Sequence, residues 1–404
     1  MNTKAINSGF HRLFHLHVDK EMVEVSLYQF FVNLGRNLIV LALPFYMYKT
    51  LGYEIWQICV FFLFWQVAFT FVMPFVGCFI DKVGLKHSMA TRSVGAAIFW
   101  VTLPLLLQEN FWLSVGLVAP FFLLRAFSRS VSEISYDIFL VHHINREMKG
   151  KTLAWLQIAI MSSVVLAPVL GGFITRYLGF QWTSYFAFLF FLTSGIVLMM
   201  TPDEKFHLPY SPKKLLIDTF KEAPKELFMA EFGRVFFDAI LWIVWPIFLI
   251  LVFKDIVSIG NIVGISSGLA IIVMFFVGRG IDKKGISKKS FRFGAYRSMC
   301  INFFRGVMWD PIALAVVDAL HKINSQTMQV PYDAEIQKWL REKDTFERAH
   351  IRWMIAENMY TVAVAFFAAI FFMVTEEIKW AFIIIFVIGS LAMLLTQTVA
   401  KFED

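Results

Sequence analysis

The strongest constraint on this chain is a series of long apolar runs that continues almost to its C-terminus. A run of about 20 apolar residues is long enough for a helix to cross the hydrocarbon core of a bilayer. The chain is 58% hydrophobic and 17% charged, whereas soluble domains are about 45–50% apolar and about 25% charged. The sequence therefore predicts an all-α protein that crosses a membrane repeatedly.

Twelve spans of this kind can be placed along the chain. Charged residues such as Arg297, Arg305 and Asp318 interrupt spans nine and ten. The longest polar stretch, 201–226, contains four prolines and divides the spans into two sets of six. The predicted spans are 24–48, 54–79, 88–107, 112–141, 152–176, 181–200, 228–253, 257–281, 291–308, 311–337, 350–374 and 378–400.

The distribution of basic residues predicts the topology. Lysine and arginine concentrate in the N-terminal tail and in alternate loops, and Lys82, Lys86 and Arg92 are assigned to the loop after span two. Cytoplasmic loops are enriched in these residues, so we expect a multi-pass protein of the plasma membrane with both termini in the cytoplasm. The predicted domains are an amphipathic cytoplasmic segment over 1–20, a six-helix bundle over 21–200, a cytoplasmic linker over 201–226 and a second six-helix bundle over 227–404.

Several function classes are disfavoured by what the sequence contains. The net charge of +7 follows from the loop bias, and no basic patch with interleaved aromatic residues predicts nucleic-acid binding. Cys59, Cys78 and Cys300 lie in apolar runs, which favours buried thiols over a disulfide or a zinc site. No Walker loop, nucleophile elbow or His-Glu-x-x-His motif is present. We therefore expect no enzyme, no cofactor and no metal site, and we expect a monomer.

One loop motif occurs twice, about 200 residues apart. Both copies read Gly-x-x-Ile-Asp-Lys-x-Gly and follow the second span of each half. The last glycine can supply the positive φ of a tight turn, and the aspartate can accept hydrogen bonds from a neighbouring helix end or arginine. An ordinary cytoplasmic turn is the alternative. The residues are Gly77, Asp81, Lys82, Gly84 and Lys86 in the first copy, and Gly278, Asp282, Lys283 and Gly285 in the second.

The doubled motif resembles the loop motif of the major facilitator superfamily, Gly-x-x-x-Asp-(Arg/Lys)-x-Gly-Arg-(Arg/Lys), although Leu85 replaces its arginine. A second segment, with Pro168, Gly171 and Gly172, is similar to the Gly-Pro-x-x-Gly-Gly motif of exporters in span five. The resemblance covers essentially the whole chain. It implies two related six-helix bundles around a central cavity lined by helices one, four, seven and ten, with the loop motifs closing the cytoplasmic side in one conformation. These motifs do not distinguish import from export.

Ionisable residues inside the spans concentrate on those four helices. Such a group is costly in hydrocarbon unless it faces a cavity or a partner. Span four carries two arginines and two acids spaced by four residues, which places them on one helical face. Span ten repeats this spacing with a histidine and an aspartate. The candidates for substrate or ion binding are Asn33, Arg36, Arg125, Arg129, Glu133, Asp137, Arg234, Asp238, His321, Asp333 and Glu357.

These charges favour a secondary active transporter that works by alternating access. Its expected partners are a small polar or charged solute, protons and the surrounding lipid bilayer. Glu133 and Asp137 are the hypothetical coupling groups, because movement of the neighbouring arginines would change their protonation. Arg36, Arg125 and Arg234 would hold an anionic or strongly polar solute through forked hydrogen bonds. A permanent ion pair without a part in transport is the alternative at each position. A lipid or lysolipid carrier and a non-transporting receptor or assembly protein are the alternative functions, since fold alone does not define function.

Overall fold

The computed structural model describes residues 20–143, 149–200, 225–284, 288–325, 332 and 346–401. Side chains are described over 21–141, 156–200, 228–272, 294–325 and 350–397, and at positions 225 and 332. All regular secondary structure in these described residues is helical, which confirms the predicted all-α class. The predicted N-terminal segment and linker lie almost entirely outside the described residues.

Helices occupy the described part of each of the twelve predicted spans, of which span ten is described over 311–325 and at 332. The first half contains α2 (Lys20–Val40), α3 (Ala42–Lys49), α4 (Ile55–Val72), η1 (Met73–Phe75), α5 (Val76–Val83), α6 (Leu85–Leu106), α7 (Phe111–His143), α8 (Lys149–Tyr177) and α9 (Phe180–Leu198). The second half contains α11 (Lys225–Phe253), α12 (Ile256–Lys284), α13 (Lys288–Val307), a helix over 311–325, α15 (Phe346–Val374), α16 (Ile378–Ala392) and η2 (Met393–Lys401).

Length and apolar composition alone qualify nine helices of the described residues to cross a bilayer. The residues of the other three predicted spans explain why these spans do not qualify by length and composition. The apolar part of α12 is described over Ile256–Ile272, and α13 and the helix over 311–325 carry the charges that interrupt spans nine and ten. Arg305, Asp318 and Lys322 of these helices pair inside the protein, as shown below, whereas Arg297 is exposed.

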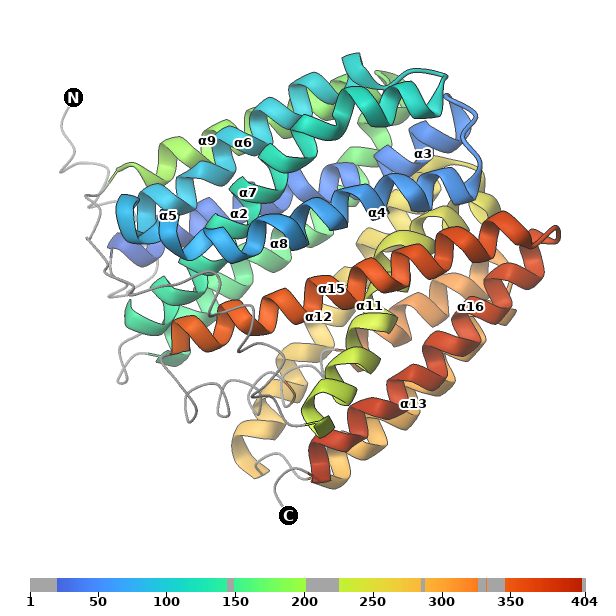
Figure 1. Ribbon diagram of the computed structural model, residues 1–404. Helices are drawn as coiled ribbons and strands as arrows, with labels where there is room; N and C mark the ends of the chain where they lie inside the picture. Colours follow the sequence, from blue (N-terminus) through green and yellow to red (C-terminus); the bar gives the residue numbers. More distant parts are fainter. Residues whose placement is uncertain are drawn as a thin grey trace.

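The two halves lie side by side (Figure 1), with the first half coloured blue to green and the second yellow to red. Two helix pairs form the seam between them, because α4 packs against α15 and α8 packs against α12. Aromatic side chains fill the core of each half. The ring centroids of Phe61 and Phe122 are 4.9 Å apart in the first half, and those of Phe248 and Phe386 are 5.7 Å apart in the second.

Small residues allow α8 and α12 to approach closely across this seam. A Cβ atom on Gly172 would lie 2.8 Å from the carbonyl oxygen of Ile256, and one on Gly260 would collide with the carbonyl oxygen of Pro168. Gly171 faces the backbone of α2 in the same way. Close backbone approach is a common basis of helix association in lipid. The segment that resembles the exporter motif therefore lies at a helix-packing contact.

Replacing Gly172 with valine should destabilise the folded protein, because overpacking a close contact costs about 1–3 kcal/mol. Gly116→Val is the matched control, since a Cβ atom on Gly116 of α7 would meet open space. Thermal unfolding of the detergent-purified proteins measures the difference. We expect a lower Tm for the Gly172 variant and a Tm near that of the unmodified protein for the control. Equal Tm values for both variants would contradict the close approach.

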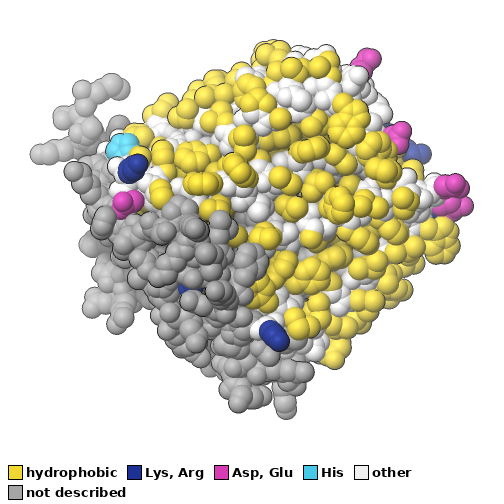
Figure 2. All heavy atoms as spheres, viewed as in Figure 1, with side chains coloured by type: hydrophobic (Ala, Val, Ile, Leu, Met, Phe, Trp, Pro, Cys, Tyr) yellow, Lys and Arg dark blue, Asp and Glu magenta, His cyan; other side chains and the backbone are white. Residues whose placement is uncertain are grey.

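Large apolar side chains cover the outside of the protein. Phe71, Ile196 and Ile312 are 67%, 71% and 76% exposed. Figure 2 shows hydrophobic side chains across the visible described surface, with the few charged side chains mainly near its edges. An apolar surface of this extent is unfavourable in water but matches the hydrocarbon of a bilayer. The protein is therefore a multi-pass membrane protein.

Candidate functional site

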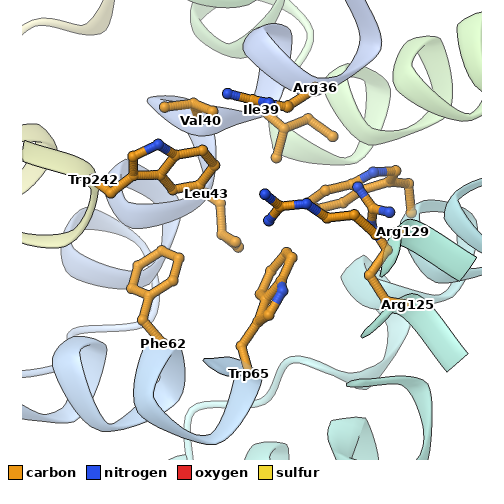
Figure 3. Close-up of a pocket in the computed structure, with 10 residues that line it drawn as sticks. Arg36, Ile39, Val40, Leu43, Phe62, Trp65, Arg125, Arg129 and Trp242 are labelled. Atoms are coloured by element: carbon orange, nitrogen blue, oxygen red, sulfur yellow. The ribbon is translucent and has the colours of Figure 1, made fainter. Parts of the chain in front are cut away.

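A small cavity lies where α2, α4 and α7 of the first half meet α11 of the second (Figure 3). Its volume is about 30 Å³, which is room for about two water molecules. Three of the predicted site residues, Arg36, Arg125 and Arg129, line it. Figure 3 shows that Phe62, Trp65 and Trp242 surround the space opposite Arg125 and Arg129, and Trp100 completes the aromatic lining.

Glu133 is bound by two arginines beside this cavity. Its Oε1 lies 2.7 Å from Nε of Arg129 and 3.4 Å from Nη1 of Arg92. The Arg129 guanidinium also lies over the ring of Phe69, 4.9 Å from its centroid. Residues four apart on a helix are neighbours, so the spacing in α7 produces the Arg129–Glu133 pair. Glu133 is accordingly held as an anion by charge-assisted hydrogen bonds.

Arg92 corrects one sequence-based assignment. The basic pattern assigned it to a cytoplasmic loop, but it lies within α6 and is 3% exposed. Lys86 from the same predicted loop is also buried and binds Glu21 of α2, with Nζ and Oε1 2.9 Å apart. The polar start of span three resembles a loop by hydropathy, whereas α6 begins at Leu85 and packs this polar segment inside the protein.

Arg125 and Arg36 are less completely paired. Arg125 is 2% exposed, and neither its Nε nor its Nη1 has a hydrogen-bond partner among the described residues. Arg36 lies over the ring of Trp242, 5.1 Å from the centroid, and its Nε likewise has no partner in the described part of the chain. In the described part of the first half, four arginines thus lie in and beside the cavity, and two of them, Arg92 and Arg129, contact the carboxylate of Glu133.

The second half has the opposite balance of charge. Arg234 of α11 donates to Glu231 at 2.5 and 3.0 Å and to Asp238 at 2.8 Å. Its Nη2 lies 3.2 Å from Glu357 of α15, and the Tyr332 hydroxyl donates to Glu231 at 2.5 Å. Arg234 and Asp238 are four residues apart in α11, and this spacing allows them to pair. Three carboxylates share one guanidinium, which leaves an excess of negative charge when all of them are ionised.

A second small cavity, also of about 30 Å³, borders Asp238 of this cluster. Arg234, Asp238, His321 and Ser325 line it. The His321 ring is buried, and its centroid lies 5.4 Å from that of Phe237. The polar face predicted for span ten is therefore directed toward α11 as far as residue 325. Asp333 lies outside the described residues.

Side-chain hydrogen bonds also cross the seam between the halves. His350 Nε2 of α15 lies 2.7 Å from Asp137 Oδ2 of α7. The side-chain amide of Gln66 on α4 donates to the side-chain oxygen of Asn358 on α15. Asp137 shares the polar face of α7 but meets the second half instead of an arginine of its own helix. Asn33 donates to the backbone oxygen of Gln29 at 2.8 Å, one turn earlier in α2.

The first copy of the loop motif forms the junction between α5 and α6. Gly84 has φ of 95° and separates the two helices, so the predicted positive φ is confirmed. Gly77 is buried, Asp81 is half-buried in the last turn of α5, and Lys82 is exposed. In the second copy, Gly278, Asp282 and Lys283 fall in the last turns of α12, where side chains are not described. Gly285 lies outside the described residues.

Three further charges of the second half pair with one another and line neither small cavity. Arg305 of α13 contacts Asp318, and Lys322 lies 2.9 Å from the same carboxylate. Lys322 also donates to the backbone oxygen of Val263 on α12 at 2.9 Å. The guanidinium of Arg305 lies 3.9 Å from the ring centroid of Trp245. These contacts explain how spans nine and ten accommodate Arg305, Asp318 and Lys322.

Sequence reasoning missed several residues of the site, among them Arg92, Trp65 and Trp242. Arg92 was hidden by its position at the polar start of a span. Trp242 could have been predicted as a site residue, because it lies four residues after Asp238 and therefore on the same face of α11. Its place against Arg36 of the other half depends on how the halves meet, which periodicity does not reveal.

Comparisons with known proteins agree with this architecture. A family model described as Major Facilitator Superfamily matches residues 25–316. A protein of Bacillus subtilis (strain 168), named as the uncharacterized MFS-type transporter YuxJ, is 28% identical over 211 residues. This match covers 50% of each of the two chains, so the chain spans about half the length of that relative.

Solved structures with the same fold cover nearly the whole chain. A D-xylose-proton symporter superposes with a TM-score of 0.69 and 12% identity over 92% of this chain and 96% of its own. The nucleoside transporter NupG superposes with a TM-score of 0.65 and 14% identity, and the match covers 95% of this chain and 99% of its own. A bacterial homologue of the iron transporter ferroportin, in an inward-facing state, superposes with a TM-score of 0.73 and 12% identity. This match covers 95% of this chain and 98% of its own. At such identities the likeness shows the fold alone.

Proposed function

This chain belongs to the Major Facilitator Superfamily and is a multi-pass membrane transporter, and we propose that it moves a small charged solute together with protons by alternating access. One observation carries the proposal, which is the separation of charge between the two halves. In the first half, Arg36, Arg92, Arg125 and Arg129 lie in and beside the cavity, and Glu133 contacts two of them, Arg92 and Arg129. In the second half, three carboxylates share Arg234.

The excess carboxylates of the second half are the proposed proton site. Like charges that share a buried site disfavour ionisation of the last member. Asp238 and Glu357 each make one contact with Arg234, whereas Glu231 accepts hydrogen bonds from both Arg234 and Tyr332. The proton is therefore assigned to Asp238 or Glu357. The sequence favoured Glu133 or Asp137, but two arginines hold Glu133 as an anion.

The arginines of the first half are the proposed solute site. A guanidinium offers several donors in a planar fork and remains charged in proteins. A negatively charged solute between Arg36, Arg125 and Arg129 would supply acceptors that the described protein groups do not. Loading the solute beside the second half then brings negative charge toward Asp238 and Glu357, which favours their protonation. Solute and proton would thus bind together.

Alternating access requires the contacts across the seam to form and break in turn. The contacts Asp137–His350 and Gln66–Asn358 join the halves through α15. Both are short side-chain contacts, whereas the α8–α12 contact relies on backbone approach at glycines. We propose that α15 moves relative to α4 and α7 during the cycle while α8 and α12 stay together. The twin loop motifs are the proposed cytoplasmic gate.

Uptake by the reconstituted protein tests this function. Proteoliposomes that contain a pH-sensitive dye are exposed to a panel of radiolabelled anions, cations and neutral solutes, with and without an imposed pH gradient. We expect one charge class to accumulate when the outside is acidic, and a gradient of that solute to move protons in the absence of an imposed pH gradient. Protein-free liposomes are the control. Uptake that ignores the pH gradient and moves no protons would contradict the coupling, and no uptake in any class would contradict transport of small charged solutes.

A further inference from the structure

We infer that the solute is an organic anion with a flat apolar body, whose anionic head is held by Arg36, Arg125 and Arg129 and whose body lies against Trp65 and Trp242. This inference rests on the proposed function, because it names the solute class of the same cavity. It goes further by separating the cavity into a part that binds charge and a part that binds an apolar group.

The head group follows from the pairing of the arginines. Burying a guanidinium without acceptors is costly, yet Arg125 is 2% exposed and two of its three nitrogens have no acceptor among the described residues. Arg36 has one such nitrogen. The carboxylate of Glu133 is already engaged by Arg129 and Arg92. A carboxylate, sulfonate or phosphate head supplies the missing acceptors in the bidentate geometry that arginine favours.

The apolar body follows from the remaining walls. Apart from the three arginines, the cavity is lined by Ile39, Val40 and Leu43 and by the four aromatic side chains Phe62, Trp65, Trp100 and Trp242. A small inorganic anion would leave these walls in contact with water. A flat organic group can stack on the indole rings, and such aromatic contacts contribute beyond the area that they bury. The walls therefore favour an aromatic anion over phosphate or sulfate.

Trp242 is the side chain that connects this site with the second half. It belongs to α11, where Arg234 and Asp238 precede it on the same face, and it is 39% exposed. The guanidiniums of Arg36 and Arg129 lie 5.1 and 6.0 Å from its ring centroid. At about 30 Å³ the cavity is too small for an aromatic acid, so binding requires lining side chains to move, and we assign this movement to Trp242 because it comes from the other half. Solute binding in the first half would thereby move a side chain of the second half.

Calorimetric titration of the purified protein tests the solute class directly. The probes are benzoate, naphthalene-2-carboxylate and indole-3-acetate, compared with inorganic phosphate, benzyl alcohol and benzylamine. We expect at least one aromatic carboxylate to bind about tenfold or more tightly than the neutral and cationic ring compounds, because only the carboxylate supplies charged acceptors to the guanidiniums. The same carboxylate should bind about tenfold or more tightly than phosphate, because its ring buries apolar area and stacks on the indole rings.

Variants separate the head from the body. Arg36→Gln should weaken binding of the aromatic carboxylate about tenfold or more, and Arg125→Gln should do the same if it folds. Trp242→Ala should weaken binding, whereas Trp242→Phe should retain most of it. Arg176→Gln is the matched control, because Arg176 is an exposed arginine at the end of α8. Its affinity should equal that of the unmodified protein.

Each outcome is decisive. Equal affinity for phosphate and aromatic carboxylates would overturn the apolar body, and tighter binding of benzylamine or no binding of any carboxylate would overturn the anionic head. Binding that is indifferent to Arg36 and Trp242 would place the solute elsewhere and overturn the inference. Arginine-dependent binding without uptake into proteoliposomes would support the anion site while contradicting the proposed transport function. The two proposals therefore fail in distinguishable ways.

Discussion

Replacing Asp238 with asparagine and Glu357 with glutamine together should reduce solute accumulation driven by a pH gradient to background. These two carboxylates share Arg234 with Glu231, and the double variant leaves one carboxylate for one arginine. No excess carboxylate then remains to take up and release a proton. Exchange of solute across the membrane should continue, because the arginines of the first half are unchanged. Accumulation and counterflow are measured in the same proteoliposomes.

The exposed carboxylate of Glu376 provides the control for this experiment. Glu376 follows the C-terminal end of α15, whereas Glu357 lies within that helix. Glu376→Gln should retain pH-driven accumulation at the level of the unmodified protein. If the double variant also retains it, the proton site is not at Asp238 and Glu357. Glu133→Gln and Asp137→Asn would then test the site that the sequence favoured.

Replacing Asp318 with asparagine should lower the stability of the folded protein by about 3–5 kcal/mol, the typical cost of removing one partner from a buried ion pair. Asp318 and Arg305 are each 1% exposed, and the same carboxylate also contacts Lys322. The variant leaves a buried guanidinium without its carboxylate. A fall in Tm and in the yield of monodisperse protein in detergent measures the loss.

A second substitution distinguishes unpaired charge from general disruption of the packing. Adding Arg305→Met to the Asp318→Asn variant removes the guanidinium that was left unpaired, while a side chain of similar length still packs against Trp245. The double variant should therefore recover part of the lost Tm, and Lys322 keeps its hydrogen bond to the Val263 carbonyl. A double variant less stable than Asp318→Asn alone would show that the arginine stabilises the helices independently of its carboxylate.

Several properties of the site could be predicted because they depend on neighbours within one helix. The four-residue spacing in α7 predicts that Arg129 and Glu133 meet, and the same spacing in α11 allows Arg234 and Asp238 to pair. Both pairs are present, at 2.7 and 2.8 Å. The positive φ of Gly84 was predicted from a local turn requirement in the same way.

Contacts between helices were not predictable from the same patterns. Arg92 looked like a loop residue because the start of α6 is polar, although that polarity serves contacts inside the first half. Asp137 looked like a member of the arginine face of α7, but it meets His350 of α15. Glu357 was a candidate from span eleven, and its partner Arg234 lies on another helix.

The sequence by itself determined the membrane class, the number and order of the spans and the division into two related halves. These properties depend on the length of apolar runs, the alternation of basic loops and a repeated motif, all of which are local along the chain. Only the tertiary structure decided that the first half gathers arginines around one carboxylate while the second gathers carboxylates around one arginine. The physical reason is that an ion pair depends on distances of a few ångströms between side chains of different helices. Hydropathy predicts that a charged residue within a span avoids lipid, but the packing of the helices determines which partner that residue contacts.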